Sequence, residues 1–188
     1  MKIVAFAASN SRQSINKQLV HYATSLLTSV DIVLLDLNDF PLPIYSEDTE
    51  NHQGIPKQAY QFLDTIKDAD AFIISLAEHN GYYTAFYKNL LDWLSRVLRS
   101  IFGHKPVLYL ATSPGPNGAA TVLQHAVNSA SYIGANLVGQ FSLPSFYDNF
   151  DQQQLSIVDP LLRDKLSQQV ALLHHTILGD LHDAFRTH

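Results

Sequence analysis

The chain has 188 residues, of which 46% are hydrophobic, and it carries a formal net charge of -5 at pH 7. This length suits one domain with a sizeable core, and the scattered positions of its 12 Lys and Arg argue against a nucleic-acid or membrane-surface partner. The absence of cysteine excludes disulfides and thiolate chemistry and fits a reducing compartment.

We expect a single domain over residues 1–188 and a cytoplasmic protein. No apolar stretch reaches the length of a membrane span. The first apolar run begins at Ile3, which leaves no room for a signal peptide.

Short apolar runs without strict polar alternation predict strands that are buried on both faces, as in parallel sheets. These runs are Ile3–Ala8, Ile32–Leu37, Ala71–Leu76, Val107–Ala111 and Leu137–Phe141. Apolar residues at three- and four-residue steps predict helices over Ile15–Val30, Phe86–Leu98, Val122–Ala130 and, after Pro160, Leu162–Ile177, with a shorter helix over Pro56–Lys67.

The alternation of strands and helices predicts a doubly wound α/β fold, with a five-stranded parallel sheet and helices on both faces. The connections Asn38–Ile55 and Ser142–Asp159 are long for a compact domain, which indicates functional loops. Ligands of such folds bind at the carboxyl ends of the strands, near the point where the strand order reverses. Three loops rich in polar residues, glycine or aromatic residues are expected there: Ser9–Asn16, Ala77–Tyr83 and Thr112–Gly118.

The first of these loops has the composition of a phosphate site. A helix that opens after a strand presents free backbone N–H groups and the positive end of its dipole. Ser9, Ser11, Ser14 and Asn16 add side-chain donors, and Arg12 adds a cation. The alternative is that serine and asparagine only cap the helix. Neither a Gly-x-Gly-x-x-Gly motif nor a Walker A motif is present, so the loop suits a terminal phosphate monoester rather than a pyrophosphate.

The other two loops are candidates for binding a flat ring. Gly81, Gly115 and Gly118 permit positive φ or close approach of a ligand, although ordinary turn chemistry is the alternative for each. Backbone groups of Asn80–Gly81 and Ser113–Gly115 are placed to bond the edge of a heterocycle.

Aromatic residues follow the second loop. Tyr82, Tyr83 and Phe86 are candidates to stack on a ring or wall it, with helix–sheet packing as the alternative, favoured for Phe86. One carboxylate and one imidazole, Glu78 and His79, are too few to predict acid–base catalysis. The histidines show no metal-binding spacing.

Four motifs resemble the NADPH-dependent FMN reductase family, whose relatives include quinone and chromate reductases and some azoreductases on the flavodoxin-like fold. They are Ser9-x-Ser-Arg-x-Ser-Ile-Asn16, Ala77-Glu-His-Asn-Gly81, Lys88-Asn-Leu-Leu-Asp-Trp93 and Ser113-Pro-Gly-x-x-Gly118, and the resemblance runs from Met1 to about Phe141. It implies bound FMN, with its phosphate at Ser9–Asn16 and its isoalloxazine edge against Glu78–Gly81 and Ser113–Gly118. The implied cofactor-binding residues are Ser9, Ser11, Arg12, Ser14, Ile15, Asn16, Glu78, His79, Asn80, Gly81, Ser113, Pro114, Gly115 and Gly118.

The resemblance also implies a homodimer or a dimer of dimers, with Lys88–Trp93 near the interface. Burial of Trp93 in the protomer's own core is the simpler interpretation of that motif. Ala8 and Ala119 stand where many relatives have glycine. Both changes are small, so FMN binding should survive them, and the second narrows the space for a nicotinamide or substrate.

By this resemblance the protein is an FMN-dependent oxidoreductase that takes hydride from NADPH or NADH and passes electrons to a small acceptor in a ping-pong cycle. No catalytic side chain or metal is expected, because the cofactor carries the chemistry. Alternatives are a flavodoxin-type electron carrier, a regulatory phosphate-binding protein, and a hydrolase, although the sequence lacks a Gly-x-Ser-x-Gly elbow. The acceptor and the choice of nicotinamide stay open, with Asn38–Asp48, Tyr82–Tyr83 and Ser142–Asp151 as expected walls above the flavin.

Overall fold

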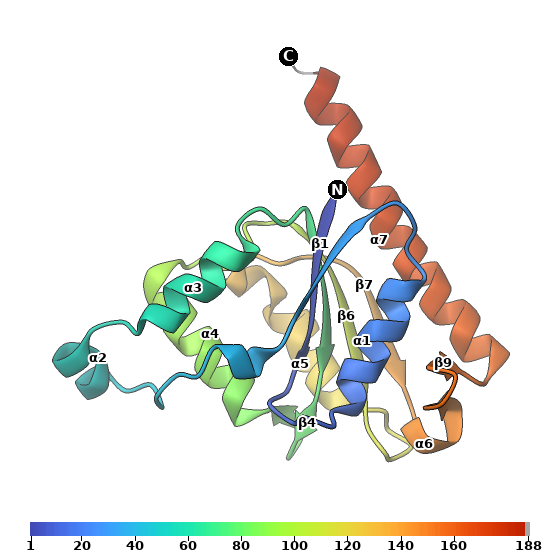
Figure 1. The fold of residues 1–188 in the computed structure, drawn as a ribbon, viewed down its shortest axis with the longest axis horizontal. Coiled ribbons are helices and arrows are strands. Elements are labelled where there is room, and N and C mark those ends of the chain that lie inside the picture. Colours follow the sequence, from blue (N-terminus) through green and yellow to red (C-terminus); the bar gives the residue numbers. More distant parts are fainter. Residues whose placement is uncertain (187–188) are drawn as a thin grey trace.

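A five-stranded parallel sheet lies at the centre of the computed structural model, which describes residues 1–186 (Figure 1). Its strand order is β2-β1-β3-β6-β7, and the strands are β1 (Lys2–Ala8), β2 (Asp31–Leu35), β3 (Ala71–Leu76), β6 (Pro106–Thr112) and β7 (Asn136–Leu143). The predicted flavodoxin-like α/β class is therefore confirmed. The last two residues of the predicted single domain lie outside the described part.

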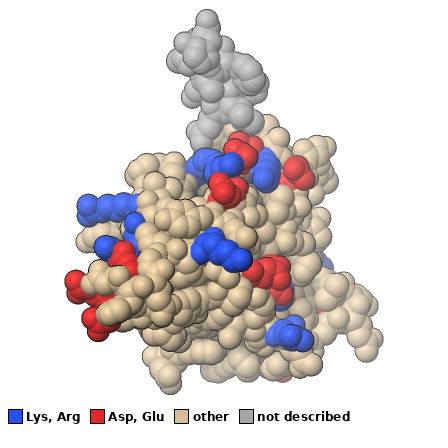
Figure 2. All heavy atoms as spheres, turned by 60° about the vertical axis from the view of Figure 1, so that its left-hand side comes forward, with Lys and Arg blue, Asp and Glu red and all other residues tan. Residues whose placement is uncertain are grey.

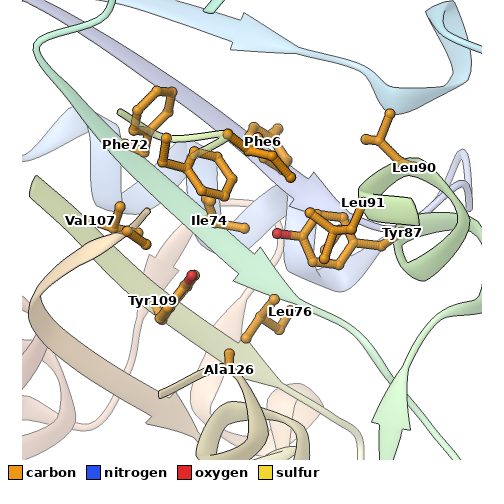
Figure 3. Packing of buried hydrophobic residues seen from close by; sticks show 14 of the residues in the cluster. Phe6, Phe72, Ile74, Leu76, Tyr87, Leu90, Leu91, Val107, Tyr109 and Ala126 are labelled. Carbon is orange, nitrogen blue, oxygen red and sulfur yellow. The ribbon is translucent and has the colours of Figure 1, made fainter. Parts of the chain in front are cut away.

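Helices cover both faces of the sheet. On one face lie α1 (Ile15–Ser25) and α7 (Pro160–Arg186), and on the other lie α3 (Lys57–Ile66), α4 (Ala85–Val97) and α5 (Ala120–Ser129). Successive residues of a strand point to opposite faces. Accordingly, Phe6 and Ile74 pack beneath the second group of helices, with Tyr87 of α4 (Figure 3), whereas Ile3 and Ile73 pack beneath the first.

The two long connections contain short elements that the apolar pattern did not predict. The first holds the 3-10 turn η1 (Leu37–Asp39) and α2 (Glu47–Gln53), and the second holds α6 (Phe146–Asn149), β8 (Phe150–Asp151) and β9 (Ser156–Ile157). Between β3 and α4 lies a hairpin of β4 (Glu78–His79) and β5 (Tyr82–Tyr83), and α5 continues into the 3-10 turn η2 (Ala130–Ile133). None of the residues of α2 is buried, so it has no apolar face for a periodicity search to find.

Three predicted boundaries were wrong. The closing helix expected over Leu162–Ile177 continues to Arg186 as α7. The helix expected over Ile15–Val30 ends at Ser25, and Ser29 has a φ of 60° in the turn that leads to β2. Leu37, expected at the end of a strand, begins η1, because the Asp36 side chain accepts a hydrogen bond from the Asn38 N–H and caps that turn. No described helix, α7 included, has the length and hydropathy to cross a membrane.

Candidate functional site

A cleft of about 230 Å³ opens where the strand order reverses, at the carboxyl ends of β1, β3 and β6. The loop after β1, the start of the β4–β5 hairpin, the end of β6 and α6 all contribute side chains. The lining residues are Ser9, Ser11, Gln13, Ser14, Ile15, Asn16, Ala77, Glu78, His79, Thr112, Ser113, Pro114 and Tyr147. The three loops singled out in the sequence thus meet at one edge of the sheet.

The amino end of α1 forms one wall of the cleft. Ser14 caps the helix, and its Oγ accepts a hydrogen bond from the Lys17 N–H at 3.3 Å. The backbone N–H groups of Ile15 and Asn16, in the first turn, precede the first intrahelical hydrogen bond. The Ser9 Oγ in turn accepts from the Ser11 N–H at 3.1 Å. Both hydroxyl oxygens therefore act as acceptors for the protein, which leaves their O–H hydrogens to donate into the cleft.

The cations of this loop and of the first turn of α1 do not line the cleft. Arg12 is exposed and does not line the cleft. Lys17 forms an ion pair with Asp36 at the end of β2. Burial raises the pKa of the Asp36 carboxyl, but hydrogen bonds from Lys17 and Asn38 more than offset this and lower that pKa below its ordinary value. The donors at the mouth of the cleft are therefore hydroxyl and backbone groups.

Asn16 joins the first turn of α1 to the ends of two strands, β3 and β6. Its Oδ1 accepts from the Ser75 hydroxyl at 2.7 Å and from the Thr112 N–H at 3.2 Å, and its Nδ2 donates to the Thr112 carbonyl at 3.2 Å. Asn16 and Ser75 are both buried. The Asn16 side chain, predicted as a ligand donor, is thus used by the protein itself, and its backbone N–H is the group left for a ligand.

The second loop is a tight hairpin with a carboxylate at its base. Asn80 and Gly81 have φ values of 53° and 76°, the two positive values that a two-residue Asn-Gly turn of type I′ needs. The Glu78 Oε2 accepts a hydrogen bond from the Val122 N–H at 2.9 Å, in the first turn of α5. Glu78 therefore fixes the hairpin to α5 and satisfies one free donor of that helix.

The third loop docks α6 against the sheet edge. The Gly115 carbonyl accepts from the Ser145 N–H at 2.9 Å, and the Ser113 carbonyl accepts from the Phe146 N–H at 3.1 Å. These bonds place Tyr147, the next residue, at the cleft. A Cβ on Gly118 would lie 2.9 Å from the backbone carbon of Leu143, so this glycine is explained by close packing of the protein's own chain.

The aromatic residues of the hairpin and of the start of α4 differ in their burial. Tyr83 is buried, its hydroxyl lies 3.2 Å from the Ser129 Oγ, and burial raises its pKa. Phe86 packs on the core, as its alternative interpretation predicted. Tyr82 is exposed, and its ring meets His125 of α5 edge-on at 4.9 Å between centroids.

Most of the predicted site residues meet in the cleft. Those that line it are Ser9, Ser11, Ser14, Ile15, Asn16, Glu78, His79, Ser113 and Pro114, whereas Arg12, Asn80, Gly81, Gly115 and Gly118 do not. Four further residues, Gln13, Ala77, Thr112 and Tyr147, line the cleft although none was named singly as a cofactor-binding residue. The first three lie inside the three loops singled out in the sequence, and Tyr147 lies in the stretch Ser142–Asp151 that was expected as a wall.

The charges around the site are sparse and mixed. Among the described residues, the titratable groups that line the cleft are Glu78, His79 and Tyr147. On the face shown in Figure 2, Lys and Arg lie among Asp and Glu, with large areas of neither. Within residues 1–186 no group of three or more His, Asp or Glu is arranged to hold a metal ion.

Comparison with known proteins identifies relatives along most of the chain. A 2-hydroxy-1,4-benzoquinone reductase of a Burkholderia species is 33% identical over 157 residues, which cover 82% of each chain. An NAD(P)H-dependent FMN reductase of Pseudomonas aeruginosa is 27% identical over 176 residues, which cover 92% of this chain and 93% of the relative. A quinone reductase of Escherichia coli is 26% identical over 142 residues, 72% of this chain and 76% of its own.

Solved structures show the same fold. FerB, a flavoenzyme NAD(P)H:(acceptor) oxidoreductase from Paracoccus denitrificans, superposes with a TM-score of 0.70 at 23% identity, over 93% of this chain and 97% of its own. The sequence model described as NADPH-dependent FMN reductase matches residues 1–148. This chain therefore belongs to the NADPH-dependent FMN reductase family.

Proposed function

We propose that this protein is an FMN-dependent NAD(P)H oxidoreductase that passes electrons from a reduced nicotinamide to a quinone or a similar small acceptor. The observation that carries the proposal is the polar cleft at the amino end of α1, where hydroxyl and backbone donors converge at the switch point of a flavodoxin-like sheet. Family membership and the names of the relatives support the same chemistry.

The residues at the first loop fit the phosphate of FMN. The free O–H hydrogens of Ser9 and Ser14 and the N–H groups of Ile15 and Asn16 are donors only, as an anion requires. Ser11 adds a hydroxyl, and Arg12 supplies the positive charge of the loop. These residues would hold the phosphate without any charged side chain buried in the cleft.

The other two loops would hold the isoalloxazine ring. Backbone groups of Glu78–Gly81 and Ser113–Gly118 would bond the edge of the ring, and Glu78 keeps the first of these loops fixed through its bond to Val122. When bound, FMN supplies the two-electron redox chemistry between the nicotinamide and the acceptor. The chain's own side chains position the ring and limit access of water to it, with Tyr147 as one wall.

We also propose that the protein works in the cytoplasm as a homodimer or a dimer of dimers. The family resemblance and the cysteine-free composition support this. The Lys88–Trp93 motif is not free to form an interface through Trp93, because that side chain is fully buried in its own protomer. Sedimentation equilibrium of the purified protein measures the assembly directly.

The proposal is tested by adding FMN to the purified protein and then each nicotinamide under anaerobic conditions. We expect stoichiometric FMN binding, bleaching of the flavin spectrum by NADH or NADPH, and recovery of the spectrum on addition of a benzoquinone. Initial rates with both substrates varied should give parallel lines. Failure to bind FMN would overturn the proposal, and binding without bleaching by either nicotinamide would favour an electron carrier instead.

A further inference from the structure

A second hollow of about 300 Å³ adjoins the cleft. Leu42 and Ile44, from the connection between η1 and α2, form one wall, and Phe86 and Asn89 of α4 form the other. His79 lines both the hollow and the cleft, and Asn10 lines the hollow from between two cleft residues. The two spaces therefore meet at the β4–β5 hairpin.

The wall that carries Leu42 and Ile44 is held by a side chain of α4. The Asn89 Nδ2 donates to the Pro43 carbonyl at 2.9 Å, and the Asn89 Oδ1 accepts from the Tyr45 N–H at 2.8 Å. One amide thus bonds the backbone on both sides of Ile44. The segment has no strand partner of its own, so these bonds fix its path.

Trp93, one helical turn further along α4, holds the same segment. Its Nε1 donates to the Pro43 carbonyl at 2.8 Å, and the Tyr45 ring packs edge-on against the indole at 5.0 Å. The Tyr45 hydroxyl donates to Glu50, which pairs with Arg96 at 2.9 Å. The Lys88–Trp93 motif therefore has a role beyond core packing, because two of its side chains clamp residues 43–45.

The part of the hollow away from the cleft suits an uncharged, apolar group. Among the described residues its lining includes no Lys, Arg, Asp or Glu, and its one titratable side chain, His79, lies at the border with the cleft. The polar side chains of Thr84 and Asn89 are bonded to the protein's own backbone. Ile44 is 76% exposed although the clamp holds its backbone in place. Binding sites are lined mainly by apolar side chains around a few polar groups, so an exposed aliphatic side chain whose backbone is held beside a polar cleft suits a ligand wall.

We propose that residues 42–45 form a fixed wall for the ring substituent of the electron acceptor, and that Ile44 sets a preference for quinones with an apolar substituent. The inference rests on the proposed function and names the part of the acceptor that this chain recognises. Asn89 and Trp93 are positioning residues, because they act on the acceptor only through the segment that they hold. His79 marks the border between the ring site and the substituent site.

The first test replaces Ile44 by alanine and compares benzoquinone with a benzoquinone that carries a decyl chain. We expect the preference for the decyl compound, as the ratio of the two kcat/KM values, to fall roughly five- to tenfold, because the wall loses three carbons of apolar surface. Leu161→Ala is the matched control, since Leu161 is a 72% exposed aliphatic residue on α7, which packs on the other face of the sheet. The same ratio in Ile44→Ala and wild type would overturn the proposal.

The second test uses Trp93→Phe, which keeps an aromatic ring in the core and removes the bond to Pro43. We expect KM for the decyl quinone to rise roughly threefold while kcat is nearly kept, since the wall is loosened and the redox centre is not. An equal fall of kcat for both quinones would indicate a general structural effect and would count against a positioning role.

Two further measurements separate this proposal from the proposed function. FMN affinity and the anaerobic rate of flavin reduction are measured in the same variants without any quinone. If wild-type protein is not reduced by a nicotinamide, the proposed function fails; if it is reduced but Ile44→Ala keeps the quinone preference, only the wall assignment fails. A change of sedimentation state in Ile44→Ala would instead assign Ile44 to a contact with a second copy of the chain and would also overturn the proposal.

Discussion

At the scale of single residues, Ser14 illustrates how one hydroxyl serves both fold and ligand. Its oxygen accepts from the Lys17 N–H and so caps α1, while its hydrogen is left to donate. Capping and anion binding are thus compatible uses of the same side chain. The two interpretations of this serine in the sequence do not exclude each other.

Ser14→Ala separates these two uses when it is compared with a second capping serine. Ser46 caps α2 through the Thr49 N–H at 3.0 Å and lies outside the cleft. We expect each alanine variant to lose about 1 kcal/mol of unfolding free energy. Only Ser14→Ala should also lose FMN affinity, by roughly tenfold, because it removes a hydrogen bond to a charged group. Urea unfolding and calorimetric FMN titration measure the two effects, and equal FMN affinity in both variants would contradict a phosphate role for Ser14.

Residue types and spacing predicted which loops meet, but not where each side chain points. From the sequence, the Asn16 side chain is predicted to donate to a phosphate. In the fold its amide is bonded instead to Ser75 and Thr112, which lie 59 and 96 residues away in the chain. Such partners depend on the strand order, which local sequence does not encode. Arg12 is on the predicted loop, yet its side chain is exposed and outside the cleft, a direction that residue type and spacing do not specify.

At the scale of elements, two turns depend on glycine for different reasons, one beside β7 and one at the end of α2. Gly118 has a φ of 59°, and an added Cβ would lie 2.4 Å from the Ser142 Oγ and 2.9 Å from the Pro144 nitrogen. Gly54 has a φ of 72°, but nothing lies within 4 Å of its Cβ position. The first site combines conformational strain with a steric clash, and the second has strain alone.

Alanine at these two positions should therefore have unequal effects. We expect Gly54→Ala to cost about 1 kcal/mol of unfolding free energy, from the positive φ alone. Gly118→Ala should cost at least about 2–3 kcal/mol and weaken FMN binding, because backbone atoms after β7 must move. Thermal unfolding and FMN titration of the two variants check this. Equal losses of unfolding free energy in the two variants would show that the loop at Gly118 accommodates a Cβ without strain. Close packing would then not explain this glycine.

The elements that apolar periodicity predicted are those with a buried face. The strands β1, β3, β6 and β7 and the helices α1, α3, α4, α5 and α7 all contribute buried residues to the core, and β2 at the sheet edge packs half-buried side chains against it. The missed elements are short or, like α2, fully outside the core, so no apolar pattern records them. α2 still has a local signal, since Ser46 is followed by Glu47 and Asp48, a cap and an acidic first turn.

At the scale of the whole molecule, the fold could be predicted because helices cover both faces of the central strands β1, β3 and β6, which makes those strands nearly continuously apolar. The site could be located as an edge of the sheet, since the switch-point rule needs only the order of the elements. Asn38–Asp48 was expected as a wall from the sequence, but the way in which residues 42–45 are held could not be predicted. It depends on contacts between Asn89, Trp93 and a segment that is more than 40 residues distant in the chain.

The core on the α4 and α5 side contains buried tyrosine hydroxyls. They make the free energy of unfolding of the whole chain fall as the pH becomes alkaline. Burial raises the pKa of Tyr109 and Tyr87 above the ordinary value of 10.0, with a smaller contribution to each from neighbouring tyrosines (Figure 3). A raised pKa means that the folded chain keeps these protons to higher pH than the unfolded chain. Their contribution to stability is therefore complete below about pH 10 and is lost as the pH rises towards the raised value.

Tyr109→Phe tests this dependence with little disturbance, because the Tyr109 hydroxyl has no hydrogen-bond partner among the described residues. At neutral pH we expect this variant to be as stable as wild type or slightly more so. Between about pH 10 and 11 the wild type should lose up to about 1.4 kcal/mol more than the variant, since one buried phenol fewer must be ionised on unfolding. Tyr132→Phe is the control, since Tyr132 is 77% exposed. Urea unfolding across this pH range measures how steeply the free energy of unfolding falls with pH. If it falls equally in Tyr109→Phe and in wild type, Tyr109 ionises in the folded protein, and water reaches the core beneath α4 and α5.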